Sequence, residues 1–368
     1  MLKDPRVTAL AQILVHHSIR VKRDDVCVLS GNKHGEPLLQ AIYEEAVKAG
    51  GHVIVNLALE GQAALLYKHA SKTQLAWIPP TKKWIYEKAD CLFQVMAETN
   101  PSELTSVSLD RQTHAQDASR RVKHTMMKRS ATGDLRWVLT MFPTKAYASK
   151  AGMSLEEYAD FYFKACLATG RDPVNAWKRN AKQTLRLSKW IEGKKKVHIE
   201  GPGTDITLGI RGRTFVPAVG ESNMPDGEFF TGPEEQSVDG VVAFNLPASR
   251  HGRPISGIRL VFKKGKVVEA TAKQNQASLR KALGIDPGAK RLGELGIGTN
   301  YSITKYTHQV LLDEKIGGTV HMALGAGYPE TGSKNRSAIH WDLITDLRKG
   351  GKITVDGKLL QKNGKFVV

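Results

Sequence analysis

Short apolar runs alternate with amphipathic stretches along the first half of the chain. Residues 26–30 and 53–58 are strand-length runs rich in Val, Ile and Leu, and residues 38–47 between them carry apolar side chains at helical spacing. Two such runs joined by one helix predict parallel strands with a crossover connection. The pattern continues with strands at 91–95 and 136–142 and helices at 4–20, 81–89, 103–132 and 154–168. We therefore predict an N-terminal layered α/β domain with a parallel sheet.

The pattern changes after residue 196. Residues 197–201 and 204–211 alternate apolar with polar side chains, which is typical of antiparallel strands with one face packed. Further strands are predicted at 238–244, 258–262 and 266–270, with one helix at 276–284. The second half is thus expected to be an α+β domain rich in antiparallel strands. The lysine run that follows Gly193 marks the junction, which gives predicted domains of 1–193 and 194–368.

Residues 173–191 predict a long amphipathic helix just before this junction. Lysines and arginines recur along one face, which we expect to be solvated. The opposite, packed face is expected to carry Trp177, Ala181, Leu185 and Ser188.

The chain has 368 residues and a formal net charge of +18. Its basic residues are spread along the sequence without a recognisable nucleic-acid module, so we do not expect a nucleic-acid partner. The three cysteines, Cys27, Cys91 and Cys166, are scattered, which favours a reducing compartment and excludes a CxxC zinc site. The N-terminus has no apolar leader and no window suits a membrane span, so a cytoplasmic protein is predicted.

A histidine and a carboxylate two residues apart are the first candidate for chemistry. In a strand, His340 and Asp342 would point from one face and Trp341 from the other. On a helix the pair would diverge and could not converge on one ion. A hydrogen-bonded histidine–carboxylate couple is the alternative interpretation.

Three more candidates lie upstream in glycine-rich surroundings. Glu228 follows Pro225-Asp-Gly and could instead serve a turn, whereas His321 alone could be a satisfied core histidine. Glu294 stands among apolar residues and, if buried, must be paired, protonated or bound to metal. Three carboxylates with two imidazoles exceed the needs of one tetrahedral ion and suit a two-metal site, with Glu294 as the bridging carboxylate.

Two further residues adjoin this set. The phenol of Tyr328, on the loop after His321, is placed to donate a hydrogen bond to a developing oxyanion, although it could simply pack the loop. Glu314 could complete the second metal site or only pair with Lys315. In the first half, the loop Gly31–Gly35 matches neither a dinucleotide nor a Walker motif, and we expect no cofactor there.

The motifs of the second half resemble those of the metal-dependent aminopeptidases of the aminopeptidase T and aminopeptidase S family. The segments that carry the resemblance begin at Asn223, Leu292, Leu312 and Ser337 and occur in the family's order. The resemblance implies that Glu228, Glu294, His321, His340 and Asp342 are metal ligands and that Tyr328 is catalytic. It also implies two divalent ions (zinc, cobalt or magnesium), a homodimer, and removal of N-terminal residues from peptides.

Two other functions stay open at this point. Related folds include iron dioxygenases that cleave dihydroxypyridine rings, and His321, His340 and Asp342 could form their two-histidine, one-carboxylate triad. The Glu228 and Glu294 carboxylates would then have little purpose. A non-catalytic protein that binds polyanions is the second alternative, suggested only by the net charge.

Overall fold

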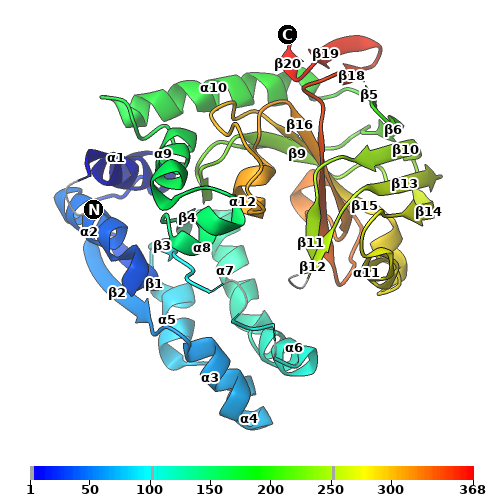
Figure 1. Ribbon diagram of the computed structural model, residues 1–368. Coiled ribbons are helices and arrows are strands. Elements are labelled where there is room, and N and C mark those ends of the chain that lie inside the picture. The colour runs from blue at the N-terminus through cyan, green and yellow to red at the C-terminus, as the bar shows by residue number, and fades with distance from the viewer. Residues whose placement is uncertain (1–3, 101–102, 106, 251–252) are drawn as a thin grey trace. The chain divides into compact units, whose positions relative to one another are not determined.

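The structure is a computed structural model that describes residues 4–100, 103–105, 107–250 and 253–368. Contacts within the chain divide it into two compact units. Unit 1 comprises Met1–Lys178 with Gly220–Met224, and unit 2 comprises Arg179–Val219 with Pro225–Val368. The domain boundary between residues 193 and 194, beyond which all the candidate ligands lie, stays a prediction. Figure 1 labels most of the elements of both units.

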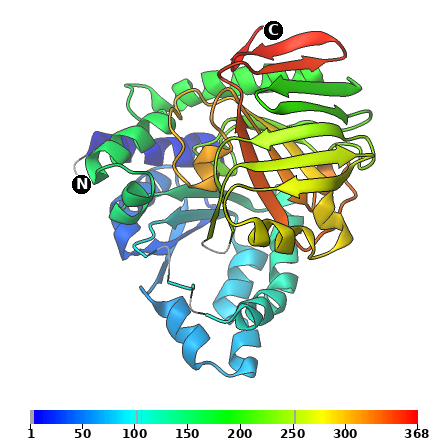
Figure 2. The same ribbon diagram turned by 45° about the vertical axis from the view of Figure 1, so that its right-hand side comes forward.

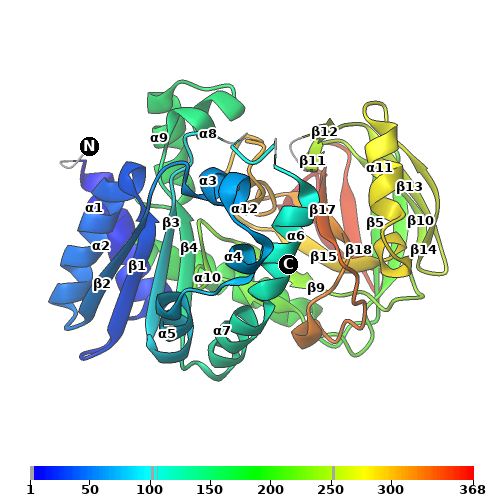
Figure 3. The ribbon, with the colours of Figure 1, turned by 90° about the horizontal axis from the view of Figure 1, so that it is seen from below.

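A five-stranded parallel sheet forms the centre of unit 1, in the order β2-β1-β3-β4-β8. Its strands are β1 (Val26–Asn32), β2 (His52–Ala58), β3 (Cys91–Met96), β4 (Arg136–Met141) and β8 (Asn223–Met224). Figure 3 shows β2, β1, β3 and β4 side by side. Cys27 pairs with Cys91 across β1 and β3, and both are fully buried, so they act as packing residues. The predicted parallel α/β domain is confirmed.

Nine α-helices lie wholly within the described part of unit 1: α1 (Pro5–Ile13), α2 (Glu36–Lys48), α3 (Gln62–His69), α4 (Lys72–Ala76), α5 (Pro80–Lys88), α6 (Leu109–Ala118), α7 (Arg120–Thr132), α8 (Lys145–Lys150) and α9 (Leu155–Ala165). The side chain of Asp4 caps α1 by accepting from the Arg6 amide, and Pro5 occupies the first turn. The predicted basic helical stretch 103–132 forms α6 and α7, with residue 106 outside the described residues.

The long helix α10 (Pro173–Ile191) has the predicted bounds, but one of its predicted packed residues is wrong. Leu185 is 47% exposed, whereas Thr184 and Leu187 are buried. Packed positions on a helix alternate between spacings of three and four, and a constant spacing of four drifts off the buried stripe. The step from Ala181 to Thr184 keeps the stripe in place.

Unit 2 is built from two antiparallel sheets over one apolar core. The larger has the order β14-β13-β10-β6-β5-β18-β19-β20, and the smaller has the order β17-β16-β15-β9-β7. The larger contains β5 (Lys196–Gly201), β6 (Thr204–Gly209), β10 (Asp239–Phe244), β13 (Ile258–Lys263), β14 (Lys266–Thr271), β18 (Lys352–Val355), β19 (Lys358–Lys362) and β20 (Lys365–Phe366). Its strands are coloured from green through yellow to red in Figure 2.

The smaller sheet contains β7 (Val216–Ala218), β9 (Glu228–Thr231), β15 (Leu292–Gly298), β16 (Thr319–Gly325) and β17 (His340–Asp346). A hairpin of β11 (Ala248–Arg250) and β12 (Arg253–Ile255), the helix α11 (Gln276–Leu283) and the short helix α12 (Val310–Asp313) complete the unit. The predicted domain of antiparallel strands is confirmed. No helix in the described ranges combines the length and the apolarity needed to cross a bilayer.

Candidate metal centre

One face of the smaller sheet gathers the predicted site residues. Residues that pair directly across antiparallel strands point to the same face. Glu228 on β9 pairs with Gly298 on β15, and His321 on β16 pairs with Gly296. On the far side of β16, Asp342 pairs with Ala323 and His340 with Gly325. Four adjacent strands therefore present their polar side chains together.

The opposite face of the same strands is apolar. Leu295 and Ile297 on β15, with Val320 and Met322 on β16, are fully buried in the core of unit 2. Because side chains alternate along a strand, every second residue is left for the site face. A bulge at Gly293 shifts the register immediately before Glu294, a common device beside functional sites.

Glycine at position 296 makes room for the His321 ring. A Cβ added at Gly296 would lie 2.0 Å from Cε1 of His321. Such a contact is impossible without moving the imidazole, so a strand interior that would otherwise favour a larger residue carries glycine here.

The two carboxylate oxygens of Glu294 face different imidazoles. Oε1 lies 3.2 Å from Nε2 of His321, and Oε2 lies 3.3 Å from Nε2 of His340. Asp342 also faces this nitrogen, and its Oδ1 lies 3.4 Å from Nε2 of His340. The Nδ1 of His340 lies 2.7 Å from the Ala326 carbonyl, so Nδ1 donates there and Nε2 faces the carboxylates.

Glu228 and Glu314 meet at a buried lysine. Lys315 Nζ lies 2.6 Å from Oε1 of Glu228 and 3.1 Å from Oε2 of Glu314. The other oxygen of Glu228 is 3.4 Å from Nε2 of His321. From the sequence, a pairing with Lys315 was one of two interpretations of Glu314. The contact between Lys315 and Glu228 could not be predicted from their spacing, because the two residues are 87 positions apart in the sequence.

Tyr328 lies at the edge of this group. Its ring packs edge-on against the His340 ring at a centroid distance of 5.2 Å, and on Phe230 at 5.3 Å. The turn that follows fixes its backbone, because the amide and hydroxyl of Thr331 both donate to the Tyr328 carbonyl. Phe230 was not predicted as a neighbour, although it stands two residues after Glu228 on the same strand and so shares its face.

The carboxylates strongly perturb the imidazoles. Burial opposes protonation of His321, but the charges of Glu228 and Glu294 outweigh it and raise the His321 pKa to about 10. In the same way burial is overcome at His340, where Asp342 and Glu294 raise the pKa to about 11. Without metal, the two rings are thus protonated at neutral pH and supply positive charge among the carboxylates.

Burial acts differently on the acids. It raises the pKa of Glu314 to about 8, with help from the negative charge of Asp342. For Asp342 itself, burial is outweighed by the hydrogen bond from His340, which lowers the pKa to about 2. Burial is likewise outweighed at Glu294, where hydrogen bonds from His321 and His340 hold the pKa below its usual range.

The donor set fits divalent metal ions. Ligands bound to one ion at about 2.0–2.2 Å lie roughly 3–3.5 Å apart, which matches the nitrogen–oxygen distances given above. Two groups of potential ligand atoms each lie within 4.8 Å of one another: Glu228, Glu314 and His321, and Glu294, His321 and Asp342. Oε2 of Glu228 and Nδ1 of His321 are buried with no hydrogen-bond partner among the described residues, and buried polar atoms of this kind call for an ion or water.

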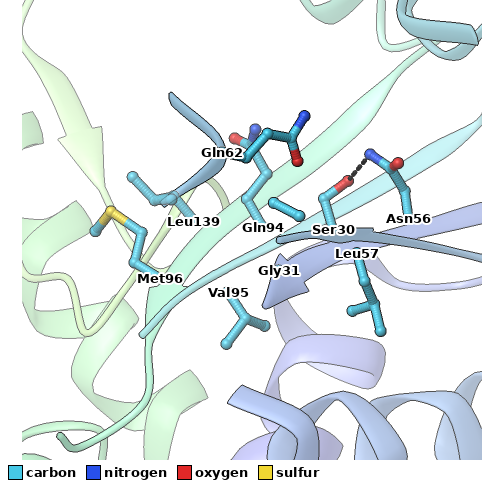
Figure 4. Close-up of a pocket in the computed structure, with 10 residues that line it drawn as sticks. Ser30, Gly31, Asn56, Leu57, Gln62, Gln94, Val95, Met96 and Leu139 are labelled. Carbon is cyan, nitrogen blue, oxygen red and sulfur yellow. Dashed lines mark hydrogen bonds between the residues drawn. The ribbon is translucent and has the colours of Figure 1, made fainter. Parts of the chain in front are cut away.

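Unit 1 has a separate pocket at the carboxyl ends of its parallel strands. The cavity has a volume of about 480 Å³. Its lining residues include Ser30, Asn56, Gln62 and Gln94, whose side chains are drawn in Figure 4. The ten described residues that line it carry no charge, so they offer no cation for a phosphate and no carboxylate for a metal.

Comparison with known proteins places the chain in a family of metal-dependent enzymes. The family described as "Thermophilic metalloprotease (M29)" matches residues 3–366. Aminopeptidase PepS of Streptococcus thermophilus is 26% identical over 94% of this chain and 92% of its own. Aminopeptidase T of Thermus aquaticus is 24% identical over 98% of both chains. The structure of wild-type AmpT from Thermus thermophilus superposes with a TM-score of 0.83 at 22% identity, over 99% of both chains.

The chain therefore belongs to the M29 family of thermophilic metalloproteases. The predicted family and enzyme class, a metal-dependent aminopeptidase of the aminopeptidase T and S group, are confirmed. The match also extends through the first half of the chain, where the sequence offered no family motif.

A second solved structure shares the fold only. The 2,5-dihydroxypyridine dioxygenase of Pseudomonas putida superposes with a TM-score of 0.60 at 12% identity, over 99% of this chain and 97% of its own. That likeness shows that the two proteins share a fold, and it says nothing about the reaction of this chain.

Proposed function

We propose that this enzyme removes the N-terminal residue of peptides by means of two divalent ions held on the smaller sheet of unit 2. Glu228, His321 and Oε1 of Glu294 would bind one ion, with Glu314 beside it. His340, Asp342 and Oε2 of Glu294 would bind the other. The observation that carries this proposal is that the two oxygens of Glu294 face two different imidazoles, as a bridging carboxylate requires.

Bound ions would lower the pKa of a shared water toward neutrality and polarise the first peptide carbonyl. The side chains supply the remaining steps. Burial, reinforced by the charge of Glu294, raises the pKa of Tyr328 above its ordinary range, so the phenol keeps its proton and can donate to the oxyanion. Nδ1 of His340 is held by the Ala326 carbonyl, which fixes the ring with Nε2 toward the ions.

The identity of the ions and the oligomeric state are proposed from the resemblance to the family. The ions are zinc, cobalt or magnesium, and the enzyme is a homodimer, which light scattering of the purified protein would test. A cytoplasmic location is supported by three buried, unpaired cysteines, since free thiols suit a reducing compartment. All six ligand candidates fall within the predicted domain 194–368.

Ring-cleaving oxidation is the second candidate, supported by the shared fold of the dioxygenase. A two-histidine, one-carboxylate site would use His321, His340 and Asp342. It gives no role to Glu294, which lies within ion-pair distance of both histidines. We therefore favour the peptidase.

Metal analysis of the purified protein, combined with a panel of aminoacyl p-nitroanilides, tests the proposal. We expect two divalent ions per chain, release of nitroaniline, loss of activity on chelation and its return on adding zinc or cobalt. A single ion per chain would overturn the two-metal arrangement. Oxygen uptake with a dihydroxypyridine, without peptidase activity, would favour the dioxygenase. Salt-sensitive polyanion binding without either activity would favour a binding protein.

A further inference from the structure

Lys315 is a buried cation that the proposed mechanism does not use. Its side chain is only 3% exposed and lies between two carboxylates, Glu228 and Glu314. Burying an ammonium is costly, and a buried ion pair commonly stabilises a fold no better than apolar residues of the same volume. A role in stability alone is therefore a weak explanation for a lysine here.

A direct role in catalysis is also excluded by the contacts. Nζ is held by Oε1 of Glu228 at 2.6 Å and Oε2 of Glu314 at 3.1 Å, within a side chain shielded from solvent. A substrate would have to displace one of these carboxylates to reach it. Lys315 can therefore act only through the acids that it touches.

The consequence for Glu228 is asymmetric. The short hydrogen bond from Lys315 occupies Oε1, whereas Oε2 is buried without a hydrogen bond from any described residue. That free oxygen lies 3.4 Å from Nε2 of His321, the separation expected of two ligands on one ion. The carboxylate is thus presented to a metal by one oxygen.

We propose that Lys315 is a positioning residue that restricts Glu228 to binding a metal ion through Oε2 alone. This inference rests on the proposed function, because it concerns the ion between Glu228 and His321. Lys315 touches neither His340 nor Asp342, which would hold the second ion, and it reaches Asp342 only through the side chain of Glu314. Outer partners that orient a ligand typically change metal affinity by about 10–100-fold.

Replacing the lysine should therefore weaken binding of the ion near His321 more than binding of the ion near His340. In Lys315→Met, both oxygens of Glu228 lose their fixed orientation, and the carboxylate becomes free to bind through two oxygens. We expect the ion near His321 to bind about 10–100-fold more weakly. Its coordination number should rise, which weakens the visible absorption of bound Co²⁺.

The experiment is a Co²⁺ titration of the metal-free, full-length protein, followed by visible absorption and equilibrium dialysis. Lys315→Met is compared with Lys315→Gln, whose amide can still donate one hydrogen bond and should recover part of the affinity. Lys352→Met is the matched control, because Lys352 makes a 2.6 Å ion pair with Glu200 at a partly exposed position of the same unit. That control should titrate like the wild type.

Unchanged affinity and absorption at both sites in Lys315→Met would overturn the inference. Equal weakening of both ions would do so as well, since it would indicate a general structural role. If neither lysine variant folds, the infrared carboxylate bands of the wild-type protein decide. When a carboxylate binds a metal through one oxygen, the separation between its antisymmetric and symmetric stretching bands widens. The absence of a pair of bands with this wider separation would contradict the proposal.

The wild-type titration separates this inference from the proposed function. Two ions and peptidase activity in the wild type, with no selective loss in Lys315→Met, would remove only the role of Lys315. A wild-type protein that binds one ion or lacks peptidase activity would instead remove the proposed two-metal peptidase.

Discussion

The two units place polar side chains on their sheets in different ways. In unit 1, the pocket lies at the ends of parallel strands and is lined by neutral side chains such as Asn56 and Gln94. In unit 2, charged side chains such as Glu294 and His321 project from the middle of antiparallel strands, and both are almost fully buried. One region offers hydrogen bonds, whereas the other offers ligands and charge.

The sheet type accounts for this difference. A parallel strand such as β1 is covered on both faces, so its run of buried residues leaves only the strand end for polar groups. Strands β15 and β16 bury one apolar face in the core and line the other with glycine, alanine and the ligands. Antiparallel packing therefore allows a rigid, charged site within a sheet. We expect the catalytic chemistry to depend on unit 2 side chains, and five predictions test that contrast.

Glu294→Gln should produce the largest loss. The amide keeps the size of the side chain but cannot bridge two cations, so kcat/KM should fall by on the order of 10³ or more, equivalent to about 4 kcal/mol. Steady-state assays with Leu-p-nitroanilide and metal analysis measure the effect. Glu269→Gln, on an exposed strand of the same unit, is the control and should retain activity. Full activity in Glu294→Gln would contradict the bridging role.

Tyr328→Phe should lower kcat by about 10²–10³ with little change in KM, as expected when one oxyanion donor is removed. The ring contacts with His340 and Phe230 remain in this variant, so the metal content should be unchanged. Tyr43→Phe, at an exposed position of unit 1, serves as the control. A rise in KM alone would indicate that Tyr328 binds substrate and does not stabilise the oxyanion.

Gly296→Ala should displace the His321 ring, because the new methyl group would lie 2.0 Å from Cε1. We expect metal affinity to fall by roughly 10–100-fold, the range found when ligand orientation is disturbed. Equilibrium dialysis against zinc measures this loss. Gly170→Ala, where an added Cβ meets no atom within 4 Å, should bind zinc like the wild type.

Metal binding should release protons from unit 2. In the metal-free protein the pKa values of His321 and His340 are raised to about 10 and about 11, so both rings are imidazolium cations at pH 8. A ligand nitrogen must be deprotonated, so the apparent metal affinity should rise with pH up to about 10. Calorimetric titrations in two buffers of different ionisation enthalpy count the protons. Affinity independent of pH between 7 and 9 would contradict protonated rings.

Asn56→Leu, in the unit 1 pocket, should have the smallest effect. The pocket residues offer no titratable group, and we expect kcat/KM for Leu-p-nitroanilide to change by less than about twofold, in line with substitutions away from a site. A loss comparable to that of Tyr328→Phe would show that the contrast between the units is wrong, and that unit 1 takes part in catalysis.

Much of this organisation could be predicted from the sequence because periodicity and spacing determine it locally. The parallel strands of unit 1 and the antiparallel strands of unit 2 followed from their apolar patterns. His340 and Asp342 do lie on one face of β17, 3.4 Å apart at their nearest nitrogen and oxygen, as their spacing of two predicts.

The contacts between distant segments could not be predicted in the same way. That Lys315 holds Glu228 depends on how the turn after α12 meets the start of β9, which no local pattern encodes. The exposure of Leu185 was missed because the packed stripe of α10 shifts by one residue. Each case depends on tertiary packing, which overrides the expectation from spacing alone.

The pairing of β15, β16 and β17 also limits how such a protein can change during evolution. Direct pairing of Gly296 with His321 and of Ala323 with Asp342 fixes the register of the three strands. Deleting one residue within β17 would exchange the faces of Trp341 and its neighbours and send the ligands into the core. Gains and losses of residues are therefore expected in the loops or at bulges such as that at Gly293, and a new activity on this scaffold is expected to arise by exchanging side chains at fixed positions.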